Sequence, residues 1–183
     1  MLNKNLIIIL GAPGSGKGTQ TNKLLENKNI SAICMGDIVR NEISNKTEFA
    51  LTMQSYLDKG DLVPDSLICD LFTRVYKKKE SYTHLILDGF PRTLFQCKHL
   101  ESVVQNEFIS KKILLIDVPN EILVQRLLER KRSDDTKSVI ENRLKTFEKE
   151  IKPILNYFTN HIIEVNGNNE IDSIYKDIIN KIK

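Results

Sequence analysis

The sequence lacks a hydrophobic run long enough to cross a membrane, and its few cysteines form no pattern typical of secreted or zinc-binding proteins. Its longest apolar runs, residues 6–10 and 113–116, have the length of a strand, whereas a bilayer requires about 20 apolar residues. The first run ends at Gly11, too early for a signal peptide. Its 3 cysteines stand far apart, without a C-x-x-C pair. We therefore expect free thiols, no zinc, no membrane association and a cytoplasmic location.

Low-complexity segments, internal repeats and linkers rich in proline, glycine or serine are also absent. The chain has 183 residues, of which 40% are hydrophobic and 28% charged, as expected for one folded domain. Its net charge of +3 lacks the clustered excess of a dedicated nucleic-acid binder. Guanidinium groups bind phosphate oxygens in pairs, so a local concentration of arginine favours a phosphorylated ligand. Such a concentration is formed by Arg126, Arg130, Arg132 and Arg143.

Short apolar runs alternate with longer segments of helical periodicity along the whole chain. This alternation predicts an α/β fold of three layers, with a parallel sheet of five strands and helices on both faces. The expected strands are 6–10, 30–34, 84–87, 113–118 and 161–165. The expected helices are 16–27, 37–45, 48–59, 65–78, 94–104, 120–130, 135–158 and 170–182. Residues 36–75 hold several helical segments and no strong strand, so we expect an insertion packed over the edge of the sheet.

A glycine-rich loop between the first strand and the first helix fits the phosphate-binding pattern G-x-x-x-x-G-K. We expect Gly14, Gly16 and Gly18 to let the backbone curl, so that its N–H groups point at a phosphate. Lys17 adds a positive charge for the β- and γ-phosphates. The whole set predicted to bind the nucleotide phosphates here is Gly14, Ser15, Gly16, Lys17, Gly18 and Thr19. A glycine-rich turn of another α/β protein is the alternative.

One position of this loop departs from the usual pattern. Gly18 stands where serine or threonine is common, and the hydroxyl arrives one residue later, at Thr19. We therefore expect Mg²⁺ to be held mainly through water and phosphate oxygens.

Three further segments accompany this loop: G-D-I-V-R at 36–40, G-D-L-V-P-D at 60–65, and D-G-F-P-R-T at 88–93 followed by Gln96. Together with G-A-P-G-S-G-K-G-T-Q at 11–20, the chain resembles the adenylate kinase family from residue 6 to about residue 165. The resemblance implies a single P-loop kinase domain that uses ATP and Mg²⁺ and has AMP as acceptor. Its parts would be a core (1–33, 76–129, 136–183), an insertion for the monophosphate (34–75) and a minimal lid (130–135).

The resemblance also implies roles for residues at the acceptor end. Arg40 and Arg92 would grip the AMP phosphate, and Gln96 would hydrogen-bond the adenine edge. Asp88 would orient the hydration shell of the magnesium ion. The implied acceptor-binding set is Met35, Arg40, Asp61, Leu62, Val63, Gly89, Phe90, Pro91, Arg92, Gln96, Arg132 and Arg143.

The base pocket departs from the family pattern, because Met35 stands where a threonine is usual. Relatives that act on pyrimidine nucleotides have a small residue there, but they also tend to have asparagine where this chain has Thr93. Thr93 and Gln96 together favour AMP. A UMP/CMP kinase with the same machinery is the alternative, followed by a non-catalytic nucleotide-binding domain, against which the retained Lys17 and Asp88 argue.

In the C-terminal half, the i, i+4 spacing of Arg126 and Arg130 places both on one helix face. The resemblance implies that Arg126 and Asn169 flank the donor adenine, and that Arg130 also contacts the donor. The implied catalytic set around the transferred phosphoryl group is Lys17, Arg92, Arg130, Arg132 and Arg143. Asp134 and Asp135 would bond to these arginines. The spacing of about three helical turns predicts that Arg132 and Arg143 share one helix face.

Only Lys131 separates Arg130 from Arg132, where the family has its lid. Residues two apart on a helix point to different sides, so we expect the helix to break at Lys131. Ser133 or Asp134 is the expected cap of the next helix. We expect a monomer whose reduced lid seals the site poorly. This predicts measurable ATP hydrolysis without acceptor, or help from a neighbouring subunit.

Overall fold

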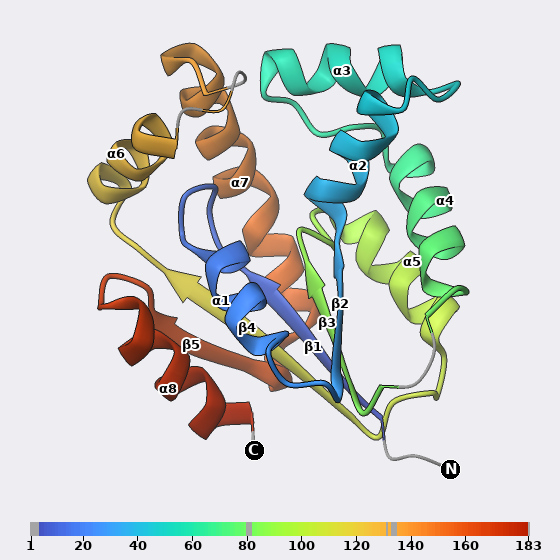
Figure 1. Cartoon of the computed structure of the whole chain (residues 1–183), viewed down its shortest axis with the longest axis vertical. Coiled ribbons are helices and arrows are strands. Elements are labelled where there is room, and N and C mark those ends of the chain that lie inside the picture. Colours follow the sequence, from blue (N-terminus) through green and yellow to red (C-terminus); the bar gives the residue numbers. More distant parts are fainter. Residues whose placement is uncertain (1–3, 80–81, 131, 133–134, 183) are drawn as a thin grey trace.

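The computed structural model describes residues 4–79, 82–130, 132 and 135–182. Its centre is a sheet of five strands in the order β2-β3-β1-β4-β5, with every neighbouring pair parallel (Figure 1). The strands are β1 (Asn5–Leu10), β2 (Ile30–Cys34), β3 (His84–Asp88), β4 (Ser110–Asp117) and β5 (Ile162–Asn166). The predicted α/β fold with a five-stranded parallel sheet is confirmed.

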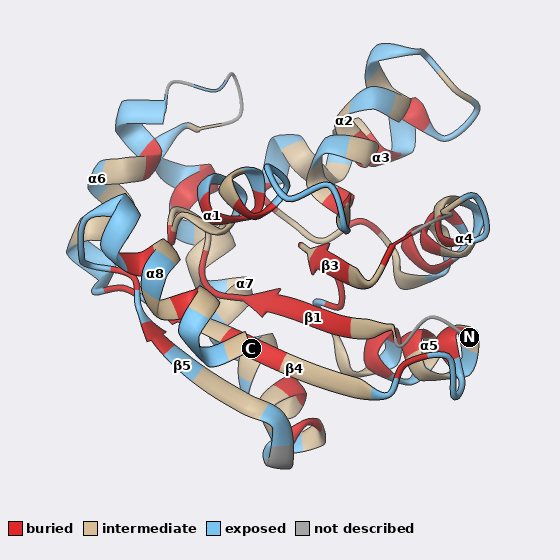
Figure 2. Cartoon of the chain, turned by 60° about the horizontal axis from the view of Figure 1, so that its bottom comes forward, coloured by how far each residue is buried: buried red, intermediate tan, exposed pale blue. Residues whose placement is uncertain are grey.

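Helices cover both faces of the sheet. One face carries α1 (Lys17–Leu24), α6 (Asn120–Arg130) and α8 (Ile171–Ile182), and the other carries α4 (Asp65–Tyr76), α5 (Leu94–Val104) and α7 (Lys137–Tyr157). Along β1, Leu6 and Ile8 join the apolar cluster on one face, while Ile7 and Ile9 join the cluster on the other. Figure 2 shows β1 buried over most of its length between these layers. A strand covered on both faces needs a continuous apolar run, which explains the first strand.

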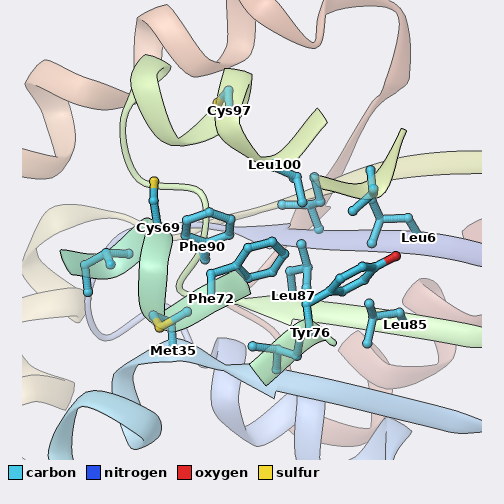
Figure 3. Close-up of a cluster of buried hydrophobic side chains, with 14 of the residues drawn as sticks. Leu6, Met35, Cys69, Phe72, Tyr76, Leu85, Leu87, Phe90, Cys97 and Leu100 are labelled. Atoms are coloured by element: carbon cyan, nitrogen blue, oxygen red, sulfur yellow. The ribbon is translucent and has the colours of Figure 1, made fainter. Parts of the chain in front are cut away.

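The cluster against α4 and α5 contains the aromatic centre of the core (Figure 3). The rings of Phe72 and Phe90 stack with their centroids 4.3 Å apart. Cys69 and Cys97 are buried beside them, and burial raises the pKa of Cys69 to about 11 and that of Cys97 to about 12. These thiols, like Cys34, are free, as expected from the sequence.

The segment between β2 and β3 consists of helices, as the sequence predicted. It contains α2 (Met35–Ser44), α3 (Ala50–Lys59) and α4. Helix α2 starts directly at the carboxyl end of β2, and α2 and α3 project beyond that end of the sheet (Figure 1). In open parallel sheets ligands bind at the carboxyl ends of the strands. The inserted helices therefore stand over the part of the fold where a ligand is expected.

Two expectations about the arginine-rich segment are wrong. Helix α6 ends at Arg130 and α7 begins at Lys137, and the hydroxyl of Thr136 caps α7 by accepting a bond from the Val139 N–H. The expected break at Lys131 and the caps Ser133 and Asp134 lie outside the described residues, but the observed cap is Thr136. Arg132 precedes α7, so helical spacing does not place it on one face with Arg143. None of the described helices is long and apolar enough to cross a bilayer.

Candidate nucleotide-binding site

One cleft of about 910 Å³ opens over the carboxyl ends of β1 and β3. Its walls come from the glycine-rich loop, the inserted helices, the arginine-rich segment and the loop that follows β5. The cleft brings together the predicted site residues Gly14, Ser15, Gly16, Lys17, Gly18, Thr19, Met35, Arg40, Asp61, Leu62, Val63, Asp88, Gly89, Pro91, Arg92, Gln96, Arg126, Arg130, Arg132, Arg143 and Asn169. Phe90 is missing from this lining.

Phe90 belongs to the core and not to the cleft wall. Its side chain is 1% exposed and stacks on Phe72. Its neighbours Gly89 and Pro91 do line the cleft. The side chain therefore anchors the segment that follows β3 to α4, and it contributes no part of the cleft wall.

The glycine-rich loop owes its shape to two of its three expected glycines. Gly14 and Gly16 have φ values of +87° and +89°, in the left-handed region that side chains disfavour. A Cβ atom on Gly14 would also lie 2.8 Å from the Leu123 carbonyl oxygen of α6. Gly18, by contrast, lies in the first turn of α1 and is absent from the left-handed glycines. The curvature of the loop therefore does not depend on a glycine at position 18.

The Lys17 ammonium group lies against the loop that precedes it. Its Nζ atom donates hydrogen bonds to the Gly11 and Ala12 carbonyl oxygens, at 2.6 and 2.8 Å. Enclosure by the protein lowers its pKa to about 8, an effect that Asp88 opposes and that the positive charges of Arg92 and Arg130 reinforce. A phosphate group at the loop would meet this cation together with the N-terminus of α1.

Asp88, the last residue of β3, faces the start of α1. Its Oδ2 atom accepts a hydrogen bond of 3.3 Å from the Thr21 hydroxyl, and a Cβ atom on Gly18 would lie 3.8 Å from the same oxygen. The hydroxyl group that donates to Asp88 thus belongs to Thr21, one helical turn after Gly18, the position where serine or threonine is common. Thr21 is fully buried, and the sequence analysis missed it. The i, i+3 spacing from Gly18 was a signal that could have found it.

This arrangement fits Mg²⁺, which prefers oxygen ligands and keeps several of its waters. Asp88 offers a carboxylate beside the phosphate loop. Among the described residues, no group of three or more acidic, histidine or cysteine side chains gathers to hold a metal. Asp88 is therefore the carboxylate that we expect to contact the hydration shell of the ion.

At the acceptor end, a hydrogen-bonded group joins α5 to the inserted helix α4. The Gln96 side chain is 1% exposed, and its Oε1 atom accepts a bond of 2.7 Å from the Arg92 N–H. Its Nε2 atom donates to Asp65 Oδ1, also at 2.7 Å, and Asp65 accepts the Thr93 hydroxyl as well. Both ends of the Gln96 amide are therefore engaged within the chain. Asp65 was not among the residues predicted for this end of the cleft.

The two arginines of the acceptor end come from different elements and both line the cleft. Arg92 donates from Nε to the Gly89 carbonyl oxygen, at 2.9 Å. Arg40 forms an ion pair with Asp37 one turn earlier in α2. Met35 is 2% exposed and lines the cleft beneath them with an apolar side chain.

The Asp135 carboxylate joins two arginines of the arginine-rich segment. Asp135 accepts two hydrogen bonds from Arg130, at 2.9 and 2.7 Å, and one from Arg143, at 3.0 Å. Its side chain is 1% exposed. Burial by itself raises the pKa of this carboxyl, but bonding to Arg130 and the charges of Arg130 and Arg143 outweigh it, so the pKa lies below its usual value. The expected bond between Asp135 and the arginines is confirmed, while Asp134 lies outside the described residues.

Arg126 and Arg130 both reach the cleft from α6, as their spacing predicted. Arg126 donates to the Gly167 carbonyl oxygen at 3.0 Å, which ties α6 to the loop after β5. Asn169 lies in that loop. Two of the histidines, which need no chemical role in the predicted reaction, hydrogen-bond outside this cleft, His84 to Asn5 and His99 to Thr73.

The sequence of the chain is similar to one known family and to several of its named members. The family model described as "Adenylate kinase" matches residues 9–163. A protein of Mycolicibacterium vanbaalenii named "Adenylate kinase" is 40% identical over 170 residues, covering 92% of this chain and 94% of that protein. One from Bacteroides thetaiotaomicron with the same name is 36% identical, covering 97% and 96%. "Adenylate kinase 1" of a Nostoc species is 34% identical, covering 94% and 95%.

Proposed function

Because the chain belongs to the adenylate kinase family, we propose that it catalyses the reversible transfer of the γ-phosphoryl group of ATP to AMP, giving two molecules of ADP. The observation that carries this proposal is the single cleft, which joins a phosphate-binding loop to a second set of cationic side chains. An enzyme that transfers phosphate between two nucleotides needs both sets to face one space.

The donor phosphates would lie at the glycine-rich loop. Backbone N–H groups at the start of α1 and the Lys17 ammonium would hold their oxygens. The base would lie between Arg126 and Asn169, which line the cleft on that side. Asp88 would hold a water of the Mg²⁺ ion. When bound, this ion neutralises charge on the transferred phosphoryl group.

The acceptor phosphate would lie between Arg40 and Arg92, with the base near Met35 and Val63. One of its oxygens attacks the γ-phosphorus in line, a new P–O bond forms, and the bond to the β-phosphate oxygen breaks. No side chain acts as nucleophile. Catalysis would consist of positioning and of charge neutralisation by Lys17 and the arginines.

The arginines supplied by α6, α7 and the segment between them would surround the transferred group. Asp135 already holds Arg130 and Arg143 together, which supports this role. The lid would be limited to residues 130–135, the insertion to 34–75, and the enzyme would act as a monomer. Free thiols at all three cysteines support a cytoplasmic enzyme.

A coupled assay with AMP, CMP, UMP and dTMP as acceptors tests the proposal. We expect AMP to give the highest kcat/KM, with two ADP formed for each ATP and AMP consumed. Met35 is the observation that favours a second candidate, a UMP/CMP kinase, because it replaces a polar group in the base pocket. A preference for CMP would overturn the assignment to AMP. The absence of turnover with every acceptor would indicate a nucleotide-binding domain without activity.

The reduced lid is tested separately by single-turnover measurement of ATP hydrolysis without acceptor. We expect slow but measurable release of phosphate, because a short lid excludes water poorly. Negligible hydrolysis by a protein that is monomeric at the assay concentration would contradict this expectation.

A further inference from the structure

The end of α3 packs directly against the first turns of α7, far from it in sequence (Figure 1). We call this contact the α3–α7 seam. It is formed by Lys59, Gly60 and Asp61 on the inserted side and by Val139, Asn142 and Arg143 on α7. The seam joins the acceptor side of the cleft to the helix that carries an arginine of the proposed catalytic set.

Asn142 supplies the hydrogen bonds of the seam. Its Nδ2 atom donates to the Lys59 carbonyl oxygen at 2.8 Å and to Asp61 Oδ1 at 2.7 Å. The first acceptor is one of the last carbonyls of α3, which have no partner within the helix. The second is a carboxylate, whose hydrogen bonds are stronger than those of neutral groups. One side chain of α7 thus satisfies two groups of the insertion.

The backbone comes equally close at this point. Gly60 has φ of +76°, and a Cβ atom on it would lie 2.7 Å from the Val139 carbonyl oxygen and 3.2 Å from Arg143 Cγ. Only glycine allows such an approach with this φ value. The backbone at Gly60, between α3 and α4, therefore packs against the aliphatic part of the Arg143 side chain.

Both sides of the seam continue into the cleft. On the inserted side, Asp61 is followed by Leu62 and Val63, and all three line the acceptor end. On the α7 side, Arg143 lines the cleft and bonds to Asp135, which also holds Arg130. A displacement at the seam would move the acceptor wall and the arginines together.

Resting on the proposed function, we propose that Asn142 is a positioning residue that couples acceptor binding to the arginines of the donor side. Asn142 is absent from the cleft wall and acts through Asp61 and through the helix that it shares with Arg143. While the Asn142 hydrogen bonds hold the seam together, a nucleotide that orders one side of the cleft also stabilises the other side in the conformation that binds the second nucleotide. By linkage, ATP and AMP must then strengthen each other's binding by the same factor.

The first test compares Asn142→Ala with Asn156→Ala. Asn156 is an exposed residue of the same helix, about 21 Å further along it, so the same chemical change is made away from the seam. We expect Asn142→Ala to raise KM for AMP about tenfold, the amount that corresponds to about 1.4 kcal/mol for the lost hydrogen bonds. We expect KM for ATP to change less than threefold. The control should match the unchanged protein in both.

The second measurement is calorimetry of AMP binding, with and without a saturating non-hydrolysable ATP analogue. In the unchanged protein and in Asn156→Ala, the analogue should tighten AMP binding severalfold. In Asn142→Ala this factor should fall towards one. Thermal unfolding of each variant reports whether it is folded.

A third test exchanges the amide and the carboxylate of Asn142 and Asp61. It distinguishes a positioning role of Asn142 from a role in packing alone. Asn142→Asp places a carboxylate against the Lys59 carbonyl oxygen and Asp61, so KM for AMP should rise more than in Asn142→Ala. Adding Asp61→Asn returns a donor opposite the new carboxylate. The double variant should regain part of the lost affinity, although each single variant is impaired.

The proposal is overturned if Asn142→Ala behaves as Asn156→Ala does, or if the unchanged protein shows no coupling between the two nucleotides. It is also overturned if Asn142→Ala raises KM for AMP and KM for ATP equally and lowers the Tm, while the double variant regains no affinity for AMP. Failure of the unchanged protein to phosphorylate AMP would instead refute the proposed function.

Discussion

The two ends of the cleft are built in different ways. The phosphate loop is one continuous segment between β1 and α1, shaped by left-handed glycines and anchored by a strand that is buried on both faces. The arginine end is assembled from α6, α7 and the segment between them, and side-chain ion pairs to Asp135 hold it together. Neighbouring residues and backbone geometry thus define one end, and contacts between side chains define the other.

This difference predicts how each end responds to substitution. A loop fixed by its backbone keeps its shape when one side chain is changed, and loses only the chemistry of that side chain. A cluster held by side-chain ion pairs loses part of its geometry when a carboxylate that joins two of its arginines is removed.

The largest effect is expected for Lys17→Met. Removing a cation that faces the transferred phosphate should lower kcat about a thousandfold. The Tm should change little, because the loop owes its shape to its backbone and the Lys17 ammonium adds only hydrogen bonds to the Gly11 and Ala12 carbonyl oxygens. Steady-state kinetics and thermal unfolding measure both. Lys23→Met is the matched control, because Lys23 lies on the same helix but pairs with Asp172 of α8 and does not line the cleft. An equal loss of activity there would contradict the prediction.

A smaller loss of activity, with a clear loss of stability, is expected for Asp135→Asn. The neutral amide leaves Arg130 and Arg143 without their shared counter-charge, so kcat should fall about thirtyfold. The free energy of unfolding should fall by about 2 kcal/mol, less than for a fully buried pair because both arginines are partly exposed. Urea unfolding at pH 7 measures this difference.

The same pair of proteins gives a pH control. The native pKa of Asp135 lies below the ordinary value of about 3.9. Its contribution to stability is therefore present above that value and is lost as the pH falls through the native pKa. The stability difference between the unchanged protein and Asp135→Asn should shrink in this acid range. A difference that is constant from pH 7 to the acid limit would show that the ion pairs are not its cause.

At the phosphate loop, the affinity for ATP should weaken by up to tenfold per pH unit as the pH rises above 8. The Lys17 pKa is lowered to about 8, and bound phosphates favour its charged form. ATP binding at pH 9 should therefore take up close to one proton. Calorimetry in buffers of different ionisation enthalpy measures this uptake, and Lys17→Met should abolish it. Uptake that persists in the variant would assign the proton to another group.

The smallest effect is expected for Thr21→Val, which keeps the shape of the buried side chain and removes the hydroxyl that donates to Asp88. The carboxylate loses one orienting bond, so the Mg²⁺ concentration for half-maximal activity should rise about threefold to fivefold. Direct Mn²⁺ binding in the presence of ATP should weaken by a similar factor. Thr21→Ser should restore both values, whereas a defect shared by the serine variant would indicate altered packing.

The sequence predicted the sheet and the phosphate loop well, and the reason is physical. The strand 30–34 and the helices 94–104 and 120–130 were predicted with the bounds that the structure has. A strand that is buried on both faces is continuously apolar, as in Leu6 to Leu10, so its composition alone predicts that both faces are covered. The loop depends on glycines that are neighbours in the chain, so its geometry is visible as a pattern.

The failures concern residues whose partners are distant in sequence. Phe90 lies in a motif that resembles a substrate-binding segment, yet its ring stacks on Phe72 in the core. The bond of Gln96 to Asp65 joins two helices and leaves no periodic signal along the chain. The bond of Thr21 to Asp88 also joins two elements, and only the i, i+3 spacing from Gly18 hints at it. The expected shared helix face of Arg132 and Arg143 was wrong, because α7 starts only after Thr136.

By itself, the sequence determined the class of fold and the phosphate loop, because composition, glycine spacing and local periodicity encode both. The resemblance to adenylate kinases added the acceptor-end residues, and together the predicted residues account for about half of the cleft wall. Only the tertiary structure decided how the insertion meets α7. Asn142 is an ordinary polar residue of a helix until folding brings the Lys59 carbonyl oxygen and Asp61 to it. Its role depends on which groups are left to pair once the backbone is in place.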